Sequence, residues 1–193
     1  MALNYLQKRI NRPIKKVIDP TFLMGKSGWQ KSLENQEYNE LMTEKYVLIY
    51  ALGGDFEKNK SIALSIAKRI NAKVYAITLS NRNKGVDRII SDATPYDFVR
   101  YIQNASFVVT NSFHGTCFSL MMGTPFLSVR FGTNPARAEE LLSYCKLEHR
   151  LQKNDKLDQI DILLDNEDVL KAQAGIALFA EESKEWLKRA VYE

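Results

Sequence analysis

The sequence predicts an α/β domain with a doubly wound, mostly parallel sheet and helices on both faces. Short apolar runs rich in β-branched and aromatic residues alternate with longer segments of helical periodicity, which is typical of a parallel sheet and its crossover helices. The 193 residues also suffice for one sizeable core without a disulfide or a metal ion. We expect a leading, linker-like segment over residues 1–44 and a single α/β domain over 45–193, with a C-terminal helix packed on it.

Apolar runs and the residues that interrupt them place each element. We expect strands at 46–52, 73–79, 86–90, 107–109 and 125–129, and helices through 62–70, from 94 through 102, from 116 to 122, from 136 to about 145 and from about 166 to 190. In the first helix Ile62, Ile66 and Ile70 recur every four residues and so fall on one face. The second helix begins at Thr94-Pro95, because threonine is a favoured cap and proline suits the first helical position.

Two further segments are expected to cover the domain. Gly25–Glu37 is rich in polar residues and glycine, and we interpret it as a linker or a cover segment. In the last helix we expect Leu178, Trp186 and Leu187 to pack on the domain, while the charged residues form a solvated face.

Composition narrows the function classes. A net charge of +4 is too small to indicate nucleic-acid binding. The sequence shows neither a signal peptide nor about 18 consecutive apolar residues, so we expect a cytoplasmic protein without a transmembrane segment. Cys117 and Cys145 lack the spacing of metal ligands, and we expect both to be reduced and buried, with no metal site.

The predicted sheet brings two loops together. In the common doubly wound order, the loops after the first and fourth strands lie side by side at the switch point. These loops are Gly53-Gly54-Asp55 and Asn111–His114. Gly53 and Gly54 are therefore candidates for contact with a substrate, although a tight turn alone also calls for glycine.

The stretch 105–129 holds the most informative pattern. Its apolar strand ends in a polar turn, and a helix of small residues follows. The free N–H groups and positive dipole end of such a helix favour an anion. Candidate binding residues are Asn111, Ser112, His114, Gly115 and Thr116. The alternative is a structural turn, in which Asn111, Ser112 and Thr116 cap the helix and His114 satisfies a carbonyl.

The string TNSFHGTCFSLMMGTPF, residues 110–126, resembles the signature of the polysaccharide pyruvyl transferase family. Members carry a strand, then N-S-F-H-G or R-L-H-G, a small-residue helix and a Pro-Phe strand. VIDPTFL at 17–23, TPYDFVRYIQNA at 94–105 and Arg137 with its Leu141-Leu142 pair are also similar to the family. The resemblance implies a Rossmann-like domain that corresponds to the C-terminal half of a B-type glycosyltransferase fold.

The resemblance also implies a reaction. The chain would help to move a pyruvyl group from phosphoenolpyruvate, its donor substrate, onto a sugar of a cell-surface glycan without a further cofactor. His114 would contact the donor and act as the catalytic acid. Members with R-L-H-G have arginine where this chain has Ser112, so Arg137 and Arg130 are the candidate replacements, since arginine binds carboxylates bidentately.

Several functions stay open at this stage. By the resemblance, the general base would come from an N-terminal half that this chain lacks, supplied by a partner chain, and a homodimer is the other possibility. A non-catalytic anion-binding module, or a truncated relative without activity of its own, would keep the anion site alone. A nucleotide-sugar glycosyltransferase domain could use the loop Thr78–Lys84, but no acid closes the second strand as a ribose ligand would.

Overall fold

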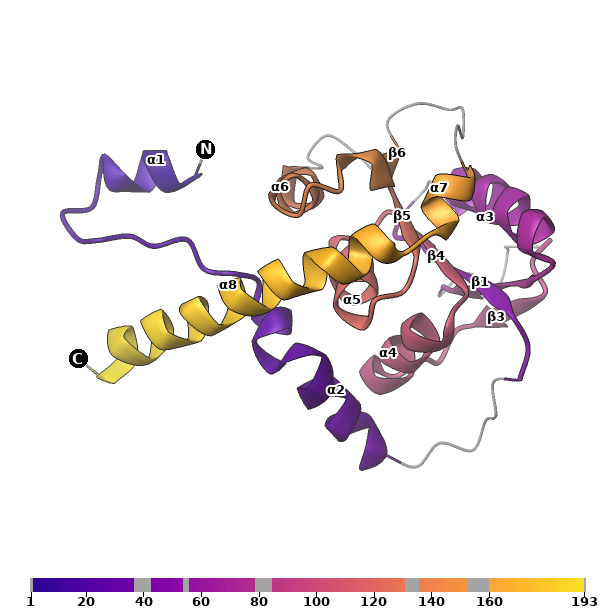
Figure 1. The fold of residues 1–193 in the computed structure, drawn as a ribbon, viewed down its shortest axis with the longest axis horizontal. Coiled ribbons are helices and arrows are strands. Elements are labelled where there is room, and N and C mark those ends of the chain that lie inside the picture. The colour runs from indigo at the N-terminus through magenta and orange to yellow at the C-terminus, as the bar shows by residue number, and fades with distance from the viewer. Residues whose placement is uncertain are drawn as a thin grey trace.

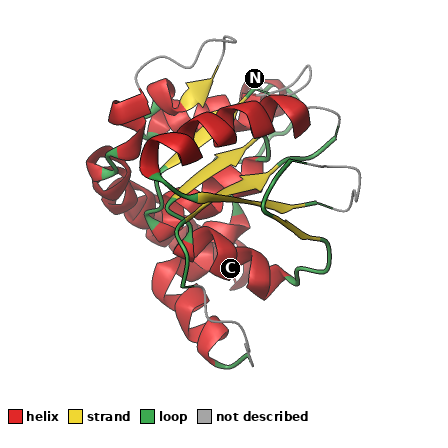
Figure 2. Cartoon of the chain, turned by 90° about the vertical axis from the view of Figure 1, so that its right-hand side faces the viewer, coloured by secondary structure: helices red, strands yellow, loops and turns green. Residues whose placement is uncertain are grey.

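Short parallel strands run through the centre of the molecule, and helices cover both of their faces (Figures 1 and 2). The computed structural model describes residues 2–36, 43–53, 56–78, 85–130, 136–152 and 160–192. The strands in these residues are β1 (Tyr46–Tyr50), β2 (Lys73–Ile77), β3 (Arg88–Ile90), β4 (Phe107–Thr110), β5 (Phe126–Val129) and β6 (Leu151–Gln152). They form a six-stranded sheet in the order β3-β2-β1-β4-β5-β6, and each neighbouring pair is parallel. The predicted doubly wound α/β class is confirmed.

Helices fill the connections and pack on both faces of the sheet. They are α1 (Ala2–Gln7), η1 (Pro20–Met24), α2 (Gly25–Glu34), α3 (Phe56–Ile70), α4 (Pro95–Asn104), α5 (Phe113–Met122), α6 (Ala136–Tyr144), η2 (Glu148–Arg150), α7 (Ile160–Leu164) and α8 (Glu167–Tyr192). Successive strand side chains point to opposite faces. Val47 and Ile49 therefore pack with α3, whereas Tyr46 and Leu48 pack on the other face with α4, α5 and α8.

The start of α4 agrees with the sequence prediction. Thr94 is the N-cap and Pro95 opens the helix. The Thr94 hydroxyl accepts a hydrogen bond from the Asp97 amide at 3.2 Å, and the Asp97 carboxylate accepts one from the Thr94 amide at 3.0 Å. This reciprocal pair satisfies donors that the first turn of a helix otherwise leaves unpaired.

The start of α5 differs from the prediction. The helix begins at Phe113 rather than at Thr116, because Ser112 serves as its N-cap. His114 and Gly115 consequently lie in the first turn of the helix and not in the turn before it. The short elements α1, β6 and α7 were not predicted, since two to six residues are too few to show a period.

Part of the leading segment belongs to the core. Ile18, Phe22 and Leu33 are buried in the same apolar cluster as α4, α5 and α8. The Ile18 amide donates to the Ser183 hydroxyl of α8 at 3.0 Å, and the Trp29 ring packs edge-on against Phe118 of α5. The division at residue 45 stays a prediction of chain organisation, but much of Gly25–Glu37 is the covering helix α2.

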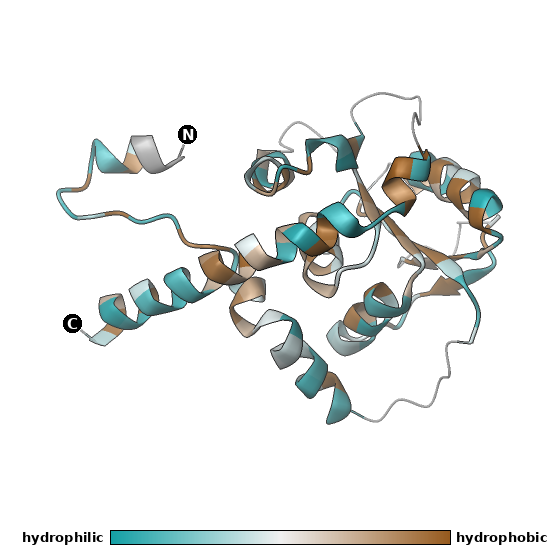
Figure 3. Ribbon diagram, in the orientation of Figure 1, coloured by the Kyte–Doolittle hydropathy of each residue, from teal (hydrophilic) through white to brown (hydrophobic). Residues whose placement is uncertain are grey.

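The final helix packs through a different face from the one expected. Val169, Ile176 and Ala180 are buried, whereas Leu178 is 69% exposed, so the prediction for Leu178 was wrong. Trp186 and Leu187 are partly buried. The C-terminal part of α8 and the N-terminal arm both extend away from the sheet (Figure 1), and polar residues dominate the end of α8 (Figure 3). Among the described residues no helix combines the length and apolarity needed to cross a membrane.

Candidate functional site

The signature segment lies at the carboxyl edge of the sheet, where β1 and β4 are neighbours. The Asn111 side chain joins the loops after these strands, because its oxygen accepts from the Leu52 amide at 2.7 Å and its nitrogen donates to the Leu52 carbonyl at 2.9 Å. The ends of β1 and β4 therefore lie side by side, as the doubly wound order predicts, while Asp55 of the predicted loop falls outside the described residues. Gly53 has φ 73°, a left-handed conformation that favours glycine. Gly54, also predicted for the site, falls outside the described residues.

Three residues of the predicted anion cradle support the fold of the turn. Ser112 and Thr116 are buried, and the Thr116 hydroxyl donates to the Ser112 carbonyl at 3.2 Å and shares a 3.0 Å hydrogen bond with the Ser128 hydroxyl. A Cβ on Gly115 would lie 2.2 Å from the Thr110 hydroxyl oxygen. The glycine therefore allows close approach of α5 to β4. A role in ligand binding stays a prediction for all three.

His114 projects from this frame toward solvent. Its side chain is 51% exposed, and its ring contacts the Phe113 ring edge-on with 5.6 Å between centroids. The Gly115 amide is directed at the Ser112 hydroxyl and the Thr116 amide donates to the Ser112 carbonyl. Helix geometry leaves the amides of Phe113 and His114 without an intrahelical acceptor. An anion at this end of α5 would meet these two amides beside the imidazole.

Asp19 is a charged site residue that sequence reasoning missed. One of its carboxylate oxygens lies 3.9 Å from His114 Nε2, and the other accepts a 2.8 Å hydrogen bond from Arg137 Nη2. The first distance is that of an ion pair when the ring is protonated, not that of a hydrogen bond. Asp19 occurs in the quoted VIDPTFL segment, but nothing local in that segment indicates contact with residues about a hundred positions away.

Arg137 completes the arrangement. It lies in the first turn of α6, its guanidinium carbon sits 3.9 Å from the centre of the Phe113 ring, and its side chain is 63% exposed. We call Asp19, Phe113, His114 and Arg137 the Asp19 cluster. Arg130, the other predicted arginine, follows β5 and lies 3.4 Å from Glu139 of α6. Of the two predicted arginines, the structure thus brings Arg137, rather than Arg130, into contact with Asp19 and Phe113.

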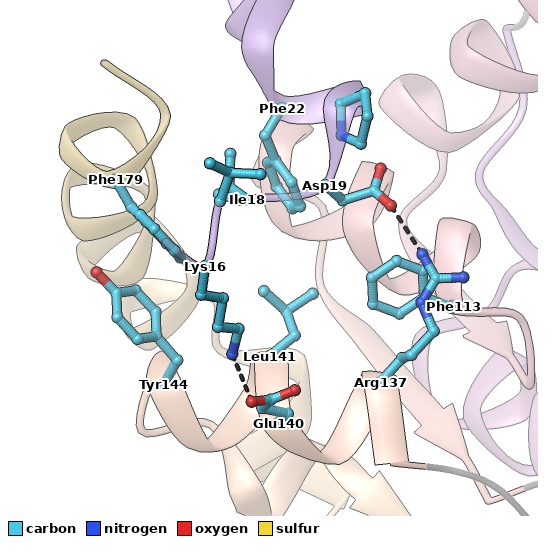
Figure 4. A pocket seen from close by; sticks show the side chains of 12 residues that line it. Lys16, Ile18, Asp19, Phe22, Phe113, Arg137, Glu140, Leu141, Tyr144 and Phe179 are labelled. Atoms are coloured by element: carbon cyan, nitrogen blue, oxygen red, sulfur yellow. Dashed lines mark hydrogen bonds and ion pairs between the residues drawn. The ribbon is translucent and has the colours of Figure 1, made fainter. Parts of the chain in front are cut away.

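A cavity of about 320 Å³ adjoins the Asp19 cluster. Figure 4 shows the Asp19–Arg137 pair at one end and the Tyr144 and Phe179 rings at the other. Lys16 and Glu140 form an ion pair at its border. The cavity wall combines aromatic and aliphatic side chains with two pairs of opposite charges, so an occupant would lie next to the guanidinium of Arg137.

Residues 2–131 match the family model described as polysaccharide pyruvyl transferase. The chain belongs to the polysaccharide pyruvyl transferase family. The matched stretch contains Asp19 and His114, and it ends before Arg137. The members of this family are glycan-modifying enzymes. No curated protein matches the chain.

Solved structures show the fold to which this pyruvyl transferase family domain is similar. Methanocaldococcus jannaschii UDP-GlcNAc 2-epimerase, in complex with UDP-GlcNAc and UDP, aligns with a TM-score of 0.54 and 15% identity, over 91% of this chain and 51% of the epimerase. S. aureus MnaA with UDP aligns with a TM-score of 0.52 and 14% identity, over 84% of this chain and 50% of that chain. The chain spans about half the length of both structures. These likenesses establish a Rossmann-like domain of the B-type glycosyltransferase kind.

Burial sets the protonation of groups around the site of this family member. It raises the pKa of Tyr50, at the end of β1, against the opposing effect of a hydrogen bond with Ser112. Burial also raises the pKa of Cys117, and the nearby Asp19 charge adds to the effect. The pKa of Cys145 is raised to about 12 by burial and by Glu148. All three groups are therefore protonated near neutral pH. Cys117 is buried as expected, and Cys145 is partly buried.

Proposed function

We propose that this chain is the donor-binding half of a polysaccharide pyruvyl transferase and that it binds phosphoenolpyruvate at the Asp19 cluster. The observation that carries the proposal is the meeting of His114 and Arg137 at one carboxylate, beside the amino end of α5. Two cationic or proton-donating side chains and the helix end together suit a ligand with a phosphate and a carboxylate.

Pyruvyl transfer makes defined demands on such a site. A proton adds to C3 of phosphoenolpyruvate, and the first sugar hydroxyl forms a bond to C2 as its own proton leaves. The second hydroxyl then forms the other C2–O bond, the bond from C2 to the phosphate oxygen breaks, and phosphate leaves with the remaining proton. A site must therefore hold the anionic groups, supply an acid at C3 and stabilise the positive charge that develops at C2.

The residues of the cluster fit distinct parts of this chemistry. Arginine presents five N–H groups in a planar fork. Arg137 donates to Asp19 through Nη2, and its other N–H groups can donate to the carboxylate of phosphoenolpyruvate. The backbone amides of Phe113 and His114 would donate hydrogen bonds to a phosphate oxygen. His114, being half exposed, is the proposed acid. Asn111, Ser112, Gly115 and Thr116 would contribute by fixing the turn, and Gly53 lies in the neighbouring loop after β1.

The acceptor side of the reaction is the second part of the proposal. The chain spans about half the length of the structures that it resembles, and an open site leaves charges in water, where electrostatic stabilisation is weak. We propose that a partner chain, or a second copy of this chain, supplies the general base and part of the acceptor site. The acceptor in this proposal is a glycan with two hydroxyls placed to form a ketal.

Calorimetric titration with phosphoenolpyruvate tests the donor site in the whole 193-residue chain. The wild type should bind saturably, and His114→Ala and Arg137→Ala should each weaken binding about 10- to 100-fold, the equivalent of losing one charge-assisted hydrogen bond. Arg69→Ala is the matched control. Arg69 also forms an exposed ion pair, with Asp161, but it lies near the end of α3, at the opposite edge of the sheet.

The outcomes separate the candidate functions. Binding that is lost in both site variants and kept in the control supports the donor site. Equal affinity for inorganic phosphate and phosphoenolpyruvate would favour an anion-binding module instead. A wild type that shows no saturable binding at millimolar concentration would reject a donor site that works without a partner.

A further inference from the structure

We infer that Asp19 is a positioning residue, which holds the Arg137 guanidinium against the Phe113 ring in the orientation that receives the donor. The inference rests on the proposed function, because it concerns the same site. It adds a residue from the leading segment, 118 positions before Arg137 in the chain.

Hydrogen bonds from its own segment of the chain fix the Asp19 carboxylate. Its Oδ1 atom accepts hydrogen bonds from the Thr21 amide at 3.1 Å and the Thr21 hydroxyl at 2.8 Å. It caps η1, in which Pro20 opens the turn and Phe22 is buried, and its side chain is only 12% exposed. The carboxylate is therefore a fixed reference point on the surface of the domain.

Arg137 needs such a reference point. A free arginine side chain has about 2 kcal/mol of rotamer entropy to lose, and this one extends from a nine-residue helix whose buried residue is Leu142. Asp19 Oδ2 holds Nη2 at 2.8 Å, and the Phe113 ring supports the guanidinium at 3.9 Å. Among the described residues the guanidinium donates only to Asp19. A carboxylate and a ring thus fix its plane and leave further N–H groups for a ligand.

The opposite role for Asp19 would be competition. A carboxylate near an anion site repels the ligand, so an Asp19 that merely occupied the place of the donor would weaken binding. The hydrogen bonds from Thr21 favour positioning, because they fix the Asp19 carboxylate at the start of η1 independently of where the Arg137 side chain lies. The two roles differ in the sign of the effect on affinity when the Asp19 charge is removed.

The chain offers a matched control for the Asp19 contact. Lys16 and Glu140 form a second ion pair between the same two segments, three residues further along α6 from Arg137. Glu140→Gln removes a carboxylate from that link just as Asp19→Asn does from the first. Asparagine is also a good N-cap, so Asp19→Asn retains the start of η1.

Two measurements test the inference. In NMR relaxation of the side-chain Nε–H groups, Asp19→Asn should increase the mobility of Arg137, while Glu140→Gln should leave it unchanged. In calorimetry with phosphoenolpyruvate, Asp19→Asn should weaken binding about tenfold and Glu140→Gln less than twofold. In an Arg137→Ala background, Asp19→Asn should change the affinity less than twofold, because a positioning residue acts through its partner.

Each outcome of these measurements either supports or overturns the inference about Asp19. Unchanged Arg137 mobility in Asp19→Asn overturns the inference, and so does tighter donor binding, which would indicate competition. An equal loss of affinity with and without Arg137 would assign Asp19 to the fold alone. If the wild type binds no phosphoenolpyruvate while Asp19→Asn loosens Arg137, the proposed function fails and the positioning contact stands.

Discussion

Among the arginines that form ion pairs with aspartate, Arg150 and Arg137 differ most clearly in their surroundings. The Arg150 side chain is 0% exposed and pairs with Asp168, whereas the Arg137 side chain is 63% exposed and pairs with Asp19. Arg150 also donates to three backbone carbonyls, those of Phe126, Leu163 and Asp165. Within the part of the chain that the structure describes, Arg137 adds only the face of an aromatic ring.

The difference separates a structural ion pair from a candidate binding group. The carbonyls bound by Arg150 belong to β5, to α7 and to the loop before α8, so one guanidinium fastens these segments together. His149 adds a contact of 2.7 Å to Asp168. An arginine whose donors are filled from the protein has nothing left for a ligand, while one held by a single carboxylate retains that capacity.

Arg150→Met should have the largest effect on stability. The substitution keeps much of the volume but leaves Asp168 without its partner and removes the donors to three carbonyls, which should lower the free energy of unfolding by about 3–5 kcal/mol. Arg137→Met should lower it by less than about 1 kcal/mol, as for other exposed pairs. Urea unfolding at pH 7 measures both. Equal losses in the two variants would contradict the distinction.

Asp168→Asn sharpens the comparison through pH. Burial alone would raise the pKa of Asp168, but the hydrogen bond and charge of Arg150, with the His149 contact, outweigh it and lower the pKa. A carboxylate with a lowered folded-state pKa stabilises the protein above its unfolded value of about 3.9. That contribution disappears as the pH falls through the folded-state pKa.

We therefore expect Asp168→Asn to lower the free energy of unfolding by about 2 kcal/mol at pH 7, with the gap to wild type shrinking below about pH 4. Urea unfolding between pH 3 and pH 7 measures the gap. Asp161→Asn is the control, since Asp161 forms an exposed pair with Arg69 and should differ from wild type by less than about 1 kcal/mol. A gap that widens in acid would refute the assignment.

Gly115 extends the comparison to the packing of α5 on β4, which supports the candidate site. A Cβ there would lie 2.2 Å from the Thr110 hydroxyl oxygen, so Gly115→Ala should cost about 1–3 kcal/mol by overpacking. Gly175 of α8 has no heavy atom within 4 Å of such a Cβ, and Gly175→Ala should be neutral or stabilising by up to about 1 kcal/mol. Thermal unfolding distinguishes the two. A neutral Gly115→Ala would show that α5 can move away from β4 without cost.

The sequence predicted what depends on local pattern. Alternating apolar runs indicated the doubly wound sheet, the Thr94-Pro95 pair located the start of α4, and the sheet order placed Asn111 beside the loop after β1. The start of α5 was misplaced, because the serine cap and the polar turn use the same residue types. Asp19 was not recognised, since its contacts with His114 and Arg137 join segments that only the tertiary structure brings together.

Arg130 gives the smallest expected effect and the finest test of the comparison. It pairs with Glu139 at 3.4 Å, a longer contact than that of Arg137 with Asp19, and among the described residues no aromatic ring packs on its guanidinium. Arg130→Ala should therefore change stability by less than about 1 kcal/mol and the affinity for phosphoenolpyruvate less than twofold. Calorimetry beside Arg137→Ala measures the difference. If Arg130→Ala weakens binding as much as Arg137→Ala does, both arginines bind the donor, and contact with the Asp19 cluster is not what distinguishes a binding arginine here.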